Sequence, residues 1–362
     1  MKELFLLDPD VVFLNHGSFG ACPRPVFETY QRWQRDLERE PVDFIARRLP
    51  GLLEEARVAL GDFVGADADD LTFVQNAGTG VNIAARAIGL EAGDEVLATD
   101  LEYGACNFAW EHVCARADAR YVRAPLDELF DHVTERTRVL FVSHITSETG
   151  LLLPVERLVA RGRELGLVTV VDGAHAPAHA PLDVRALGAD FYAGNCHKWL
   201  CAPKGAGFLY VNPDLQERVD GAIVSWGYAD GGGTFISRTE EQGTRDSAAY
   251  LSVPAAIDFV REHDDPARCI ELAREARREL CALTGQEPIA PESMVLRMAS
   301  FRVPDAEEVQ RQLWEQHRIE IPAMRPDLLR ISVAMYTERE DVDRLLSALA
   351  RQLDAEHAEQ HQ

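Results

Sequence analysis

Short runs of apolar residues alternate along the chain with longer segments in which apolar residues recur every three or four positions. The runs predict β-strands, and the longer segments, such as 52–64 and 81–88, predict amphipathic helices. Because several runs are apolar throughout, they are typical of strands buried on both faces of a parallel sheet. This alternation predicts an α/β fold with helices on both sides of the sheet. The expected strands are 71–74, 95–98, 139–142, 168–171, 191–193 and 207–211.

The pattern changes after a predicted helix at 252–262. A polar stretch at 263–266 ends in proline, and the following residues predict two strands, at 300–303 and 329–334, and a closing helix from 338 to about 353. We therefore expect an N-terminal arm over residues 1–20, a large domain over 21–262 and a small C-terminal α+β domain over 263–362.

Composition narrows the class of protein. The 362 residues include 60 acidic and 37 basic side chains, which gives a net charge of −23, and no basic block interrupts the acidic excess. Nucleic acid and anionic membrane are therefore not expected partners. The start of the chain has no long apolar stretch, so we expect a cytoplasmic protein. The seven cysteines lack zinc-site spacing, so we expect free thiols and no metal.

Two polar residues follow neighbouring predicted strands. Asp172 comes directly after the run 168–171, and Lys198 comes shortly after 191–193. Because ligands bind outside the carboxyl ends of parallel strands, we expect both side chains at one site. A carboxylate there can pair with a protonated pyridine nitrogen, and a lysine can form a Schiff base. Separately, each residue has an ordinary interpretation as a turn cap or a surface lysine.

Three neighbours extend this pattern. His175, three residues after Asp172, is placed to reach the hydroxyl of a pyridine ring. Asn195 and His197 are placed to reach a phosphate or Lys198 itself. Together these residues predict a site for pyridoxal 5'-phosphate.

The residues around this site carry a family resemblance. Residues 172–177 (DGAHAP) and 194–211 (GNCHKWLCAPKGAGFLYV) resemble the class V group of fold-type I pyridoxal phosphate enzymes. The resemblance is greatest to the isopenicillin N epimerase-like branch, through residues 14–20, 102–107, 225–228 and 242–246. It implies a large domain with a mostly parallel seven-stranded sheet between helices, a smaller C-terminal domain and bound pyridoxal phosphate.

The resemblance also implies roles in cofactor binding. Ala77, Gly78 and Thr79 form a small-residue turn at a predicted helix start, where backbone N–H groups bind phosphate. Tyr103 matches a position whose ring stacks on the pyridine, and its hydroxyl could transfer protons. Thr244 matches a residue that reaches the phosphate of a neighbouring subunit, which implies a homodimer with shared active sites.

Further residues are implied for the substrate. Arg330 lies in a predicted apolar strand and matches the position that clamps the substrate α-carboxylate, although a structural ion pair would also satisfy it. Arg245 could contact a second anionic group or pair with Asp246. The pocket walls are expected to include Asn15 and Ser18, which lie in the 14–20 motif.

Several reactions share this machinery. Lys198 can act as the base at Cα, and an epimerase needs a second acid/base, for which Tyr103 and His16 are the candidates. A carbon–sulfur β-lyase acting on an S-substituted cysteine, or a class V aminotransferase, needs no such pair. Cysteine desulfuration is disfavoured because the segment 317–324 lacks a cysteine. A non-catalytic protein that binds the cofactor is the remaining alternative.

Overall fold

The structure, a computed structural model, describes residues 1–360. These residues form two compact units. The large unit comprises Pro25–Ile145 and Leu153–Arg261, and the small unit comprises Met1–Arg24, Thr146–Leu152 and the chain from Glu262 onward. The small unit thus takes a short segment from within the predicted large domain, and the sequence-based domain bounds stay a prediction.

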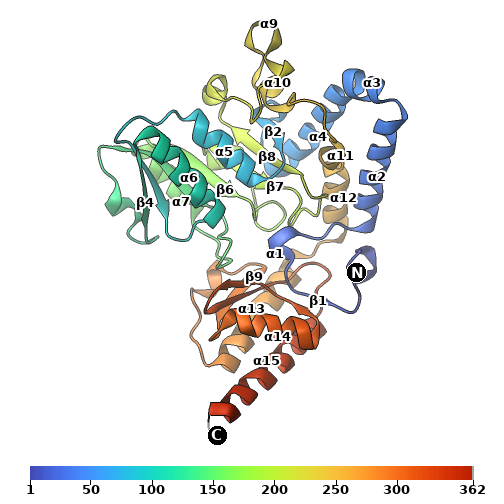
Figure 1. Cartoon of the computed structure of the whole chain (residues 1–362), viewed down its shortest axis with the longest axis vertical. Coiled ribbons are helices and arrows are strands. Elements are labelled where there is room, and N and C mark those ends of the chain that lie inside the picture. Colours follow the sequence, from blue (N-terminus) through green and yellow to red (C-terminus); the bar gives the residue numbers. More distant parts are fainter. Residues whose placement is uncertain (361–362) are drawn as a thin grey trace. The chain divides into compact units, whose positions relative to one another are not determined.

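A seven-stranded sheet forms the centre of the large unit (Figure 1). Strand β8 runs antiparallel to both of its neighbours, β2 and β7, and the remaining pairs are parallel. The predicted mostly parallel sheet is therefore confirmed. In spatial order the strands are β2 (Leu71–Val74), β8 (Gly207–Val211), β7 (Phe191–Asn195), β6 (Val168–Gly173), β5 (Thr137–Ser143), β3 (Glu95–Thr99) and β4 (Arg120–Ala124).

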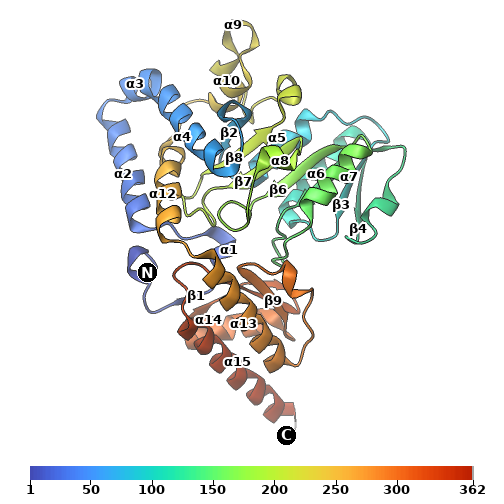
Figure 2. The same cartoon turned by 180° about the vertical axis from the view of Figure 1, so that it is seen from behind.

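Helices cover both faces of this sheet. Figures 1 and 2 show α5 (Ala77–Ala87) and α6 (Gly104–Ala117) over one face and α7 (Val155–Glu164) over the other. The predicted helix at 81–88 begins four residues earlier, at Ala77, because the Asn76 side chain caps it by accepting the N–H of Thr79. Other helices of this unit are α2 (Arg24–Arg39), α3 (Pro41–Asp43), α4 (Leu49–Val64), α8 (Val184–Leu187), α9 (Ala229–Gly232), α10 (Phe235–Glu240), α11 (Ala248–Leu251) and α12 (Val253–His263).

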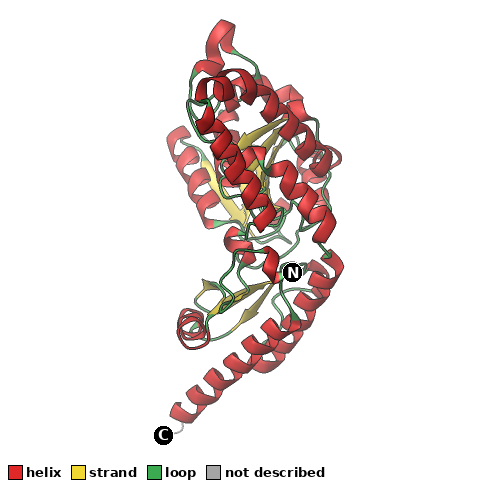
Figure 3. Ribbon diagram, turned by 90° about the vertical axis from the view of Figure 1, so that its right-hand side faces the viewer, coloured by secondary structure: helices red, strands yellow, loops and turns green. Residues whose placement is uncertain are grey.

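The small unit has an α+β arrangement. Its three-stranded antiparallel sheet, in the order β11 (Ala323–Arg325), β12 (Leu328–Ser332) and β9 (Met298–Arg302), lies beside helices (Figure 3). A short strand from the N-terminal arm, β1 (Val12–Phe13), pairs in parallel with β10 (Ile319–Glu320). The helices are α1 (His16–Phe19), α13 (Pro266–Thr284), α14 (Ala306–His317) and α15 (Arg339–Gln360). Within residues 1–360, no helix combines the length and apolarity that crossing a membrane requires.

Candidate active site

Asp172 lies at the end of the central strand β6, with Ser143 beside it on β5 and Ala193 on β7. Its carboxyl group is buried and accepts the N–H of Ala174 at 2.9 Å, and the thiol of Cys106 lies 3.4 Å away. Burial raises the pKa of Asp172, against which the Ala174 N–H and the charge of Lys198 act. A peptide N–H and a weak thiol donor compensate a buried carboxylate poorly, so this site suits a charged donor such as a pyridinium nitrogen.

Lys198 and His175 are in direct contact. The lysine Nζ lies 3.0 Å from Nε2 of the buried His175, and the indole N–H of Trp199 donates to His175 Nδ1 at 3.4 Å. Trp199 packs in turn on the ring of His179, with a centroid distance of 4.1 Å. The histidine therefore positions the lysine amine, while its predicted contact with a ring hydroxyl stays a prediction.

The turn at the start of α5 leaves one backbone donor open. The N–H of Ala77 donates to the side-chain oxygen of Asn195 at 2.8 Å, and that of Thr79 donates to Asn76. Among the described residues, the N–H of Gly78 has no acceptor. An open N–H in the first turn of a helix is a donor for a phosphate oxygen.

A glycine brings this turn close to the sheet. A Cβ atom on Gly80 would lie 2.8 Å from the Cβ of Ala193 on β7, so only glycine permits the observed packing of α5. This close approach lets Asn195, at the end of β7, reach the N–H of Ala77. The turn at the start of α5 and the strand end that precedes Lys198 are thereby held together.

A cavity of about 430 Å³ adjoins these residues in the large unit. His197 Nδ1 donates to the carbonyl of Ala206 at 3.0 Å, and burial, with the charges of Lys198 and Lys204, lowers the pKa of His197 to about 4. His197 is therefore neutral near pH 7. The cavity is lined by Tyr30, Gln75, Asn76, His197, Lys204, Gly205, Arg245, Asp246, Ala249 and Tyr250.

Arg245 faces this cavity without a carboxylate partner among the described residues. One guanidinium nitrogen donates to the carbonyl of Glu240 at 3.0 Å, and the group lies over the Tyr250 ring at 5.4 Å. Asp246 instead accepts hydrogen bonds from Gln34 at 2.8 Å and from the N–H of Ala248 at 2.8 Å. Of the two predicted roles for Arg245, the structure favours the anion contact over the pairing with Asp246.

Tyr103 and Thr244 are both accessible in the large unit. Tyr103 is the residue immediately before α6 and is 46% exposed. Thr244 is exposed and lies next to Arg245. Both side chains are therefore free to meet a molecule outside their own unit.

In the small unit, Arg330 lies on β12 and is only 1% exposed. Its guanidinium donates to the carbonyl of Ser147 and, at 3.3 Å, to the hydroxyl of Ser18. Its Nε has no partner, and no carboxylate lies within ion-pair distance among the described residues. Burial lowers the pKa of Arg330 to about 10. The charge of Glu148 opposes this decrease without forming an ion pair, so the buried guanidinium is suited to bind an anion.

Two predicted substrate residues belong to the same network. The Ser18 hydroxyl donates to the side-chain oxygen of Asn15 at 2.5 Å, and the Asn15 amide donates to Glu320 at 3.0 Å. His16, by contrast, is buried and its Nδ1 lies 2.9 Å from the hydroxyl of Tyr336. His16 is thus buried in the small unit whereas Tyr103 is accessible in the large unit, and both stay candidates for the second acid/base.

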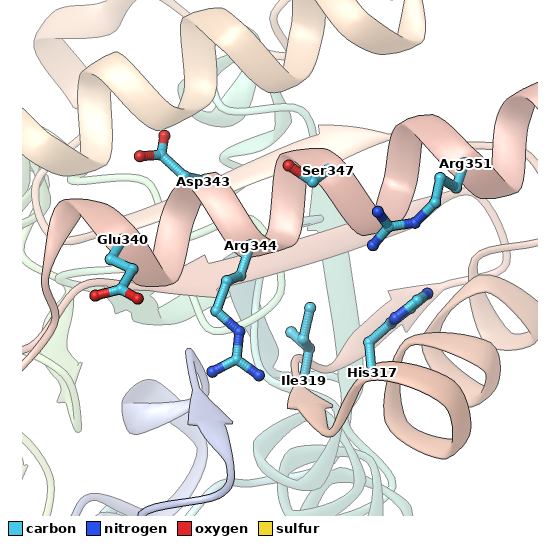
Figure 4. Close-up of a pocket in the computed structure, with 7 residues that line it drawn as sticks. All are labelled: His317, Ile319, Glu340, Asp343, Arg344, Ser347 and Arg351. Atoms are coloured by element: carbon cyan, nitrogen blue, oxygen red, sulfur yellow. The ribbon is translucent and has the colours of Figure 1, made fainter.

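A separate cavity of about 240 Å³ lies between α15 and the end of α14 (Figure 4). Arg344 and Arg351 extend from α15 toward Ile319 and His317. None of the predicted site residues lines it, so we assign it no part in the chemistry.

One site residue was not predicted from the sequence. Glu102 follows β3 and its carboxyl is buried next to Ser143 at the same strand ends as Asp172. An acidic residue three positions after an apolar strand was the available signal, but its burial depends on packing between distant segments.

Comparisons with known proteins place this site in a family. The family model for class V aminotransferases matches residues 25–345. The chain is 39% identical to an isopenicillin N epimerase of Streptomyces clavuligerus, over 95% of both chains, and 29% identical to a protein of Oryza sativa named for L-cysteine desulfhydrase activity, over 94% of this chain and 82% of that one. A solved structure of C-DES with glycine linked to its pyridoxal phosphate has a TM-score of 0.88 at 24% identity, covering 97% and 99% of the chains.

The chain therefore belongs to the aminotransferase class V family. It is a pyridoxal phosphate enzyme of fold type I. Its own residues fit that cofactor, because Asp172 has no charged donor among the described residues, Gly78 offers an open N–H and Lys198 supplies the amine.

Proposed function

We propose that this enzyme inverts the configuration at Cα of an amino acid, as an epimerase of the isopenicillin N type. The similarity to the Streptomyces epimerase over nearly the whole chain carries this proposal. Two features of the large unit support it: the contact between Lys198 and His175, and the accessible hydroxyl of Tyr103. Inversion requires two groups that exchange protons with Cα, and we assign Lys198 and Tyr103 to these roles.

The cofactor, when bound, withdraws electrons from Cα and so acidifies its hydrogen. In this proposal Lys198, oriented by His175, removes the proton on one face, and the hydroxyl of Tyr103 returns a proton on the other. Asp172 binds the ring nitrogen. Gly78 and Thr79 bind the phosphate, for which Gly78 offers an N–H, and His197 donates to it from Nε2 in the protonated form that a neighbouring phosphate charge favours.

The small unit binds the carboxylate of the substrate in this proposal. Arg330 supplies the positive charge and Ser18 fixes one of its nitrogen atoms. Asn15 holds the Ser18 hydroxyl. Arg245, in the cavity of the large unit, is assigned to a second anionic group.

A carbon–sulfur β-lyase is the second candidate. It is favoured by the relative named for L-cysteine desulfhydrase activity. The same Lys198 would remove the Cα proton, and Tyr103 would then give its proton to the departing sulfur rather than to Cα. An aminotransferase would use Lys198 alone for both proton transfers.

We also propose a homodimer in which Thr244 reaches the phosphate bound by the neighbouring subunit. The exposure of Thr244 supports this role, as does that of Trp226, which is 82% exposed on the same unit. Ile223 and Val224, close to Trp226 in the chain, are also exposed, and a group of exposed apolar side chains is typical of a protein–protein interface. The cytoplasmic location stays a prediction.

Isotope exchange separates these activities. The purified enzyme is incubated with isopenicillin N in deuterated water and the product is examined by mass and chirality. Deuterium at Cα with inversion supports an epimerase, and Tyr103→Phe should then abolish inversion. Release of pyruvate from an S-substituted cysteine, with no inversion of isopenicillin N, would contradict the epimerase proposal and support a β-lyase. Lys198→Ala should remove either activity.

A further inference from the structure

Glu102 is a second buried carboxyl group at the cofactor site. It is 3% exposed and follows β3, and its two oxygens accept the hydroxyls of Thr99 and Ser143, both at 2.5 Å. Ser143 lies directly beside Asp172 in the register of β5 and β6. A single serine therefore separates the two carboxyl groups.

Both carboxyl groups also act on one thiol. Cys106 lies 3.4 Å from Asp172, and its pKa is raised by burial and then by the charges of Asp172 and Glu102. Two carboxyls in one dry site do not ionise independently, because the second negative charge is repelled by the first. Burial, against which Ser143 and Thr99 act, raises the pKa of Glu102 to about 7, and Asp172 adds to the increase.

We propose that Glu102 is a positioning residue that holds a proton while Asp172 carries the negative charge facing the ring nitrogen of the cofactor. Because a hydroxyl can donate or accept, Ser143 can bond either form of Glu102. When Glu102 loses its proton, a second negative charge beside Asp172 strengthens the hold on the ring-nitrogen proton. The protonation state of the bound cofactor then responds to Glu102. This inference rests on the cofactor role of Asp172 proposed above and not on the reaction.

The other groups around Glu102 titrate elsewhere. The hydroxyl of Tyr121 on β4 donates to the side chain of Asn107 at 2.6 Å, and the Asn107 amide donates to the backbone carbonyl of Glu102. Burial raises the pKa of Tyr121. Burial also raises the pKa of Cys106 on α6 and lowers that of His144, after β5, to about 4. The remaining charged groups are Asp172 and, farther out, Lys198, Arg123 and Glu111.

The test is a pH titration of the absorbance of the holoenzyme. The wild-type spectrum should show an inflection near pH 7. Glu102→Gln should lack this inflection. Glu102→Asp keeps a titratable group and should show the inflection at a shifted pH. Glu95→Gln is the matched control, because Glu95 is a buried carboxylate at the opposite end of the same strand, bonded to Thr134 at 2.6 Å. It should keep the wild-type inflection. Identical curves for wild type and Glu102→Gln would overturn the proposal.

A second readout needs no cofactor. The infrared carbonyl band of a protonated carboxyl in the wild-type apoprotein should fade as the pH rises through 7, and the part of the band that Glu102→Gln lacks belongs to Glu102, because burial also raises the pKa values of Asp172 and Glu240. A band absent at pH 6 would refute the proposal even if Glu102→Gln does not fold. If the wild type binds no pyridoxal phosphate after reconstitution, the assigned cofactor roles fail, while the infrared band still tests the proton on Glu102.

Discussion

The amine of Lys198 lies 3.0 Å from Nε2 of His175, and this histidine is fixed from its other side by the indole N–H of Trp199. A flexible lysine side chain is thus held by a rigid, buried ring. Positioning of this kind matters because a proton-transferring group must lie within hydrogen-bond reach of its target.

Replacing His175 should therefore slow proton transfer more than it weakens substrate binding. For His175→Asn we expect kcat to fall about 100-fold or more, with a smaller change in KM. Steady-state kinetics with cofactor content measured in parallel checks this. His179→Asn, which alters a ring behind Trp199 rather than the lysine contact, is the control and should lower kcat less. An unchanged kcat in His175→Asn would show that the contact has no part in the reaction.

Removing the charge of Arg330 should weaken substrate binding selectively. For Arg330→Gln we expect kcat/KM for amino acids to fall about 100-fold or more, with cofactor content unchanged. Unfolding free energy should fall little, because an unpaired buried charge is itself destabilising. Arg302→Gln, at an exposed arginine of the same sheet paired with Asp327, is the matched control and should keep wild-type kinetics. Equal losses in both variants would argue against a carboxylate clamp.

Adding one methyl group at Gly80 should move the turn at the start of α5 away from the sheet. In Gly80→Ala the new Cβ would lie 2.8 Å from that of Ala193, so α5 must move. We expect a loss of about 1–3 kcal/mol in unfolding free energy and weaker retention of the cofactor. Denaturant unfolding and dialysis measure the two effects. Gly51→Ala in α4, which meets no atom within 4 Å, should instead be neutral or stabilising.

The pKa of Glu102 predicts how stability depends on pH. The unfolded chain releases this proton near the ordinary value of 4.5, whereas the fold keeps it until about pH 7. The contribution of Glu102 to the free energy of unfolding is therefore complete below pH 4.5 and is lost as the pH rises through 7. The total loss is about 3 kcal/mol. Urea unfolding of the apoprotein near pH 5 and pH 8 should show this decline. Glu102→Gln should reduce it, and an equal decline in this variant would contradict the raised pKa of Glu102.

Shared active sites predict complementation between inactive variants. If Thr244 serves the neighbouring subunit, a mixed dimer of Lys198→Ala and Thr244→Ala contains one site with both residues intact. Random pairing at equal amounts should then restore about a quarter of wild-type activity. Each variant alone supplies the baseline. No recovery in confirmed mixed dimers would place Thr244 in its own subunit's site or outside the chemistry.

The strands that carry the site were predictable because they are buried on both faces and so read as apolar runs, as β6 does. The edge strand β4 was missed, since four of its five residues are exposed or half-buried and its sequence is polar. The start of α5 was also misplaced, because a run of alanine, glycine and threonine gives no apolar spacing and the cap depends on Asn76.

Identities of site residues were easier to predict than their partners. Asp172 and Lys198 follow strands whose ends meet, so their positions follow from the fold class. The contact of Lys198 with His175, the bond from Ala77 to Asn195 and the burial of Glu102 depend on side-chain packing between distant segments. No periodicity in the sequence encodes such contacts.

The uncompensated charge of Arg330 has a practical consequence for anyone who handles this enzyme. If Arg330 binds the substrate carboxylate as proposed, acetate, formate or citrate in a buffer should compete with the substrate. Inhibition constants measured in such buffers would describe the displacement of a salt ion rather than the intrinsic affinity of the pocket. A carboxylate-free medium is therefore the proper reference state for every affinity determined on this protein.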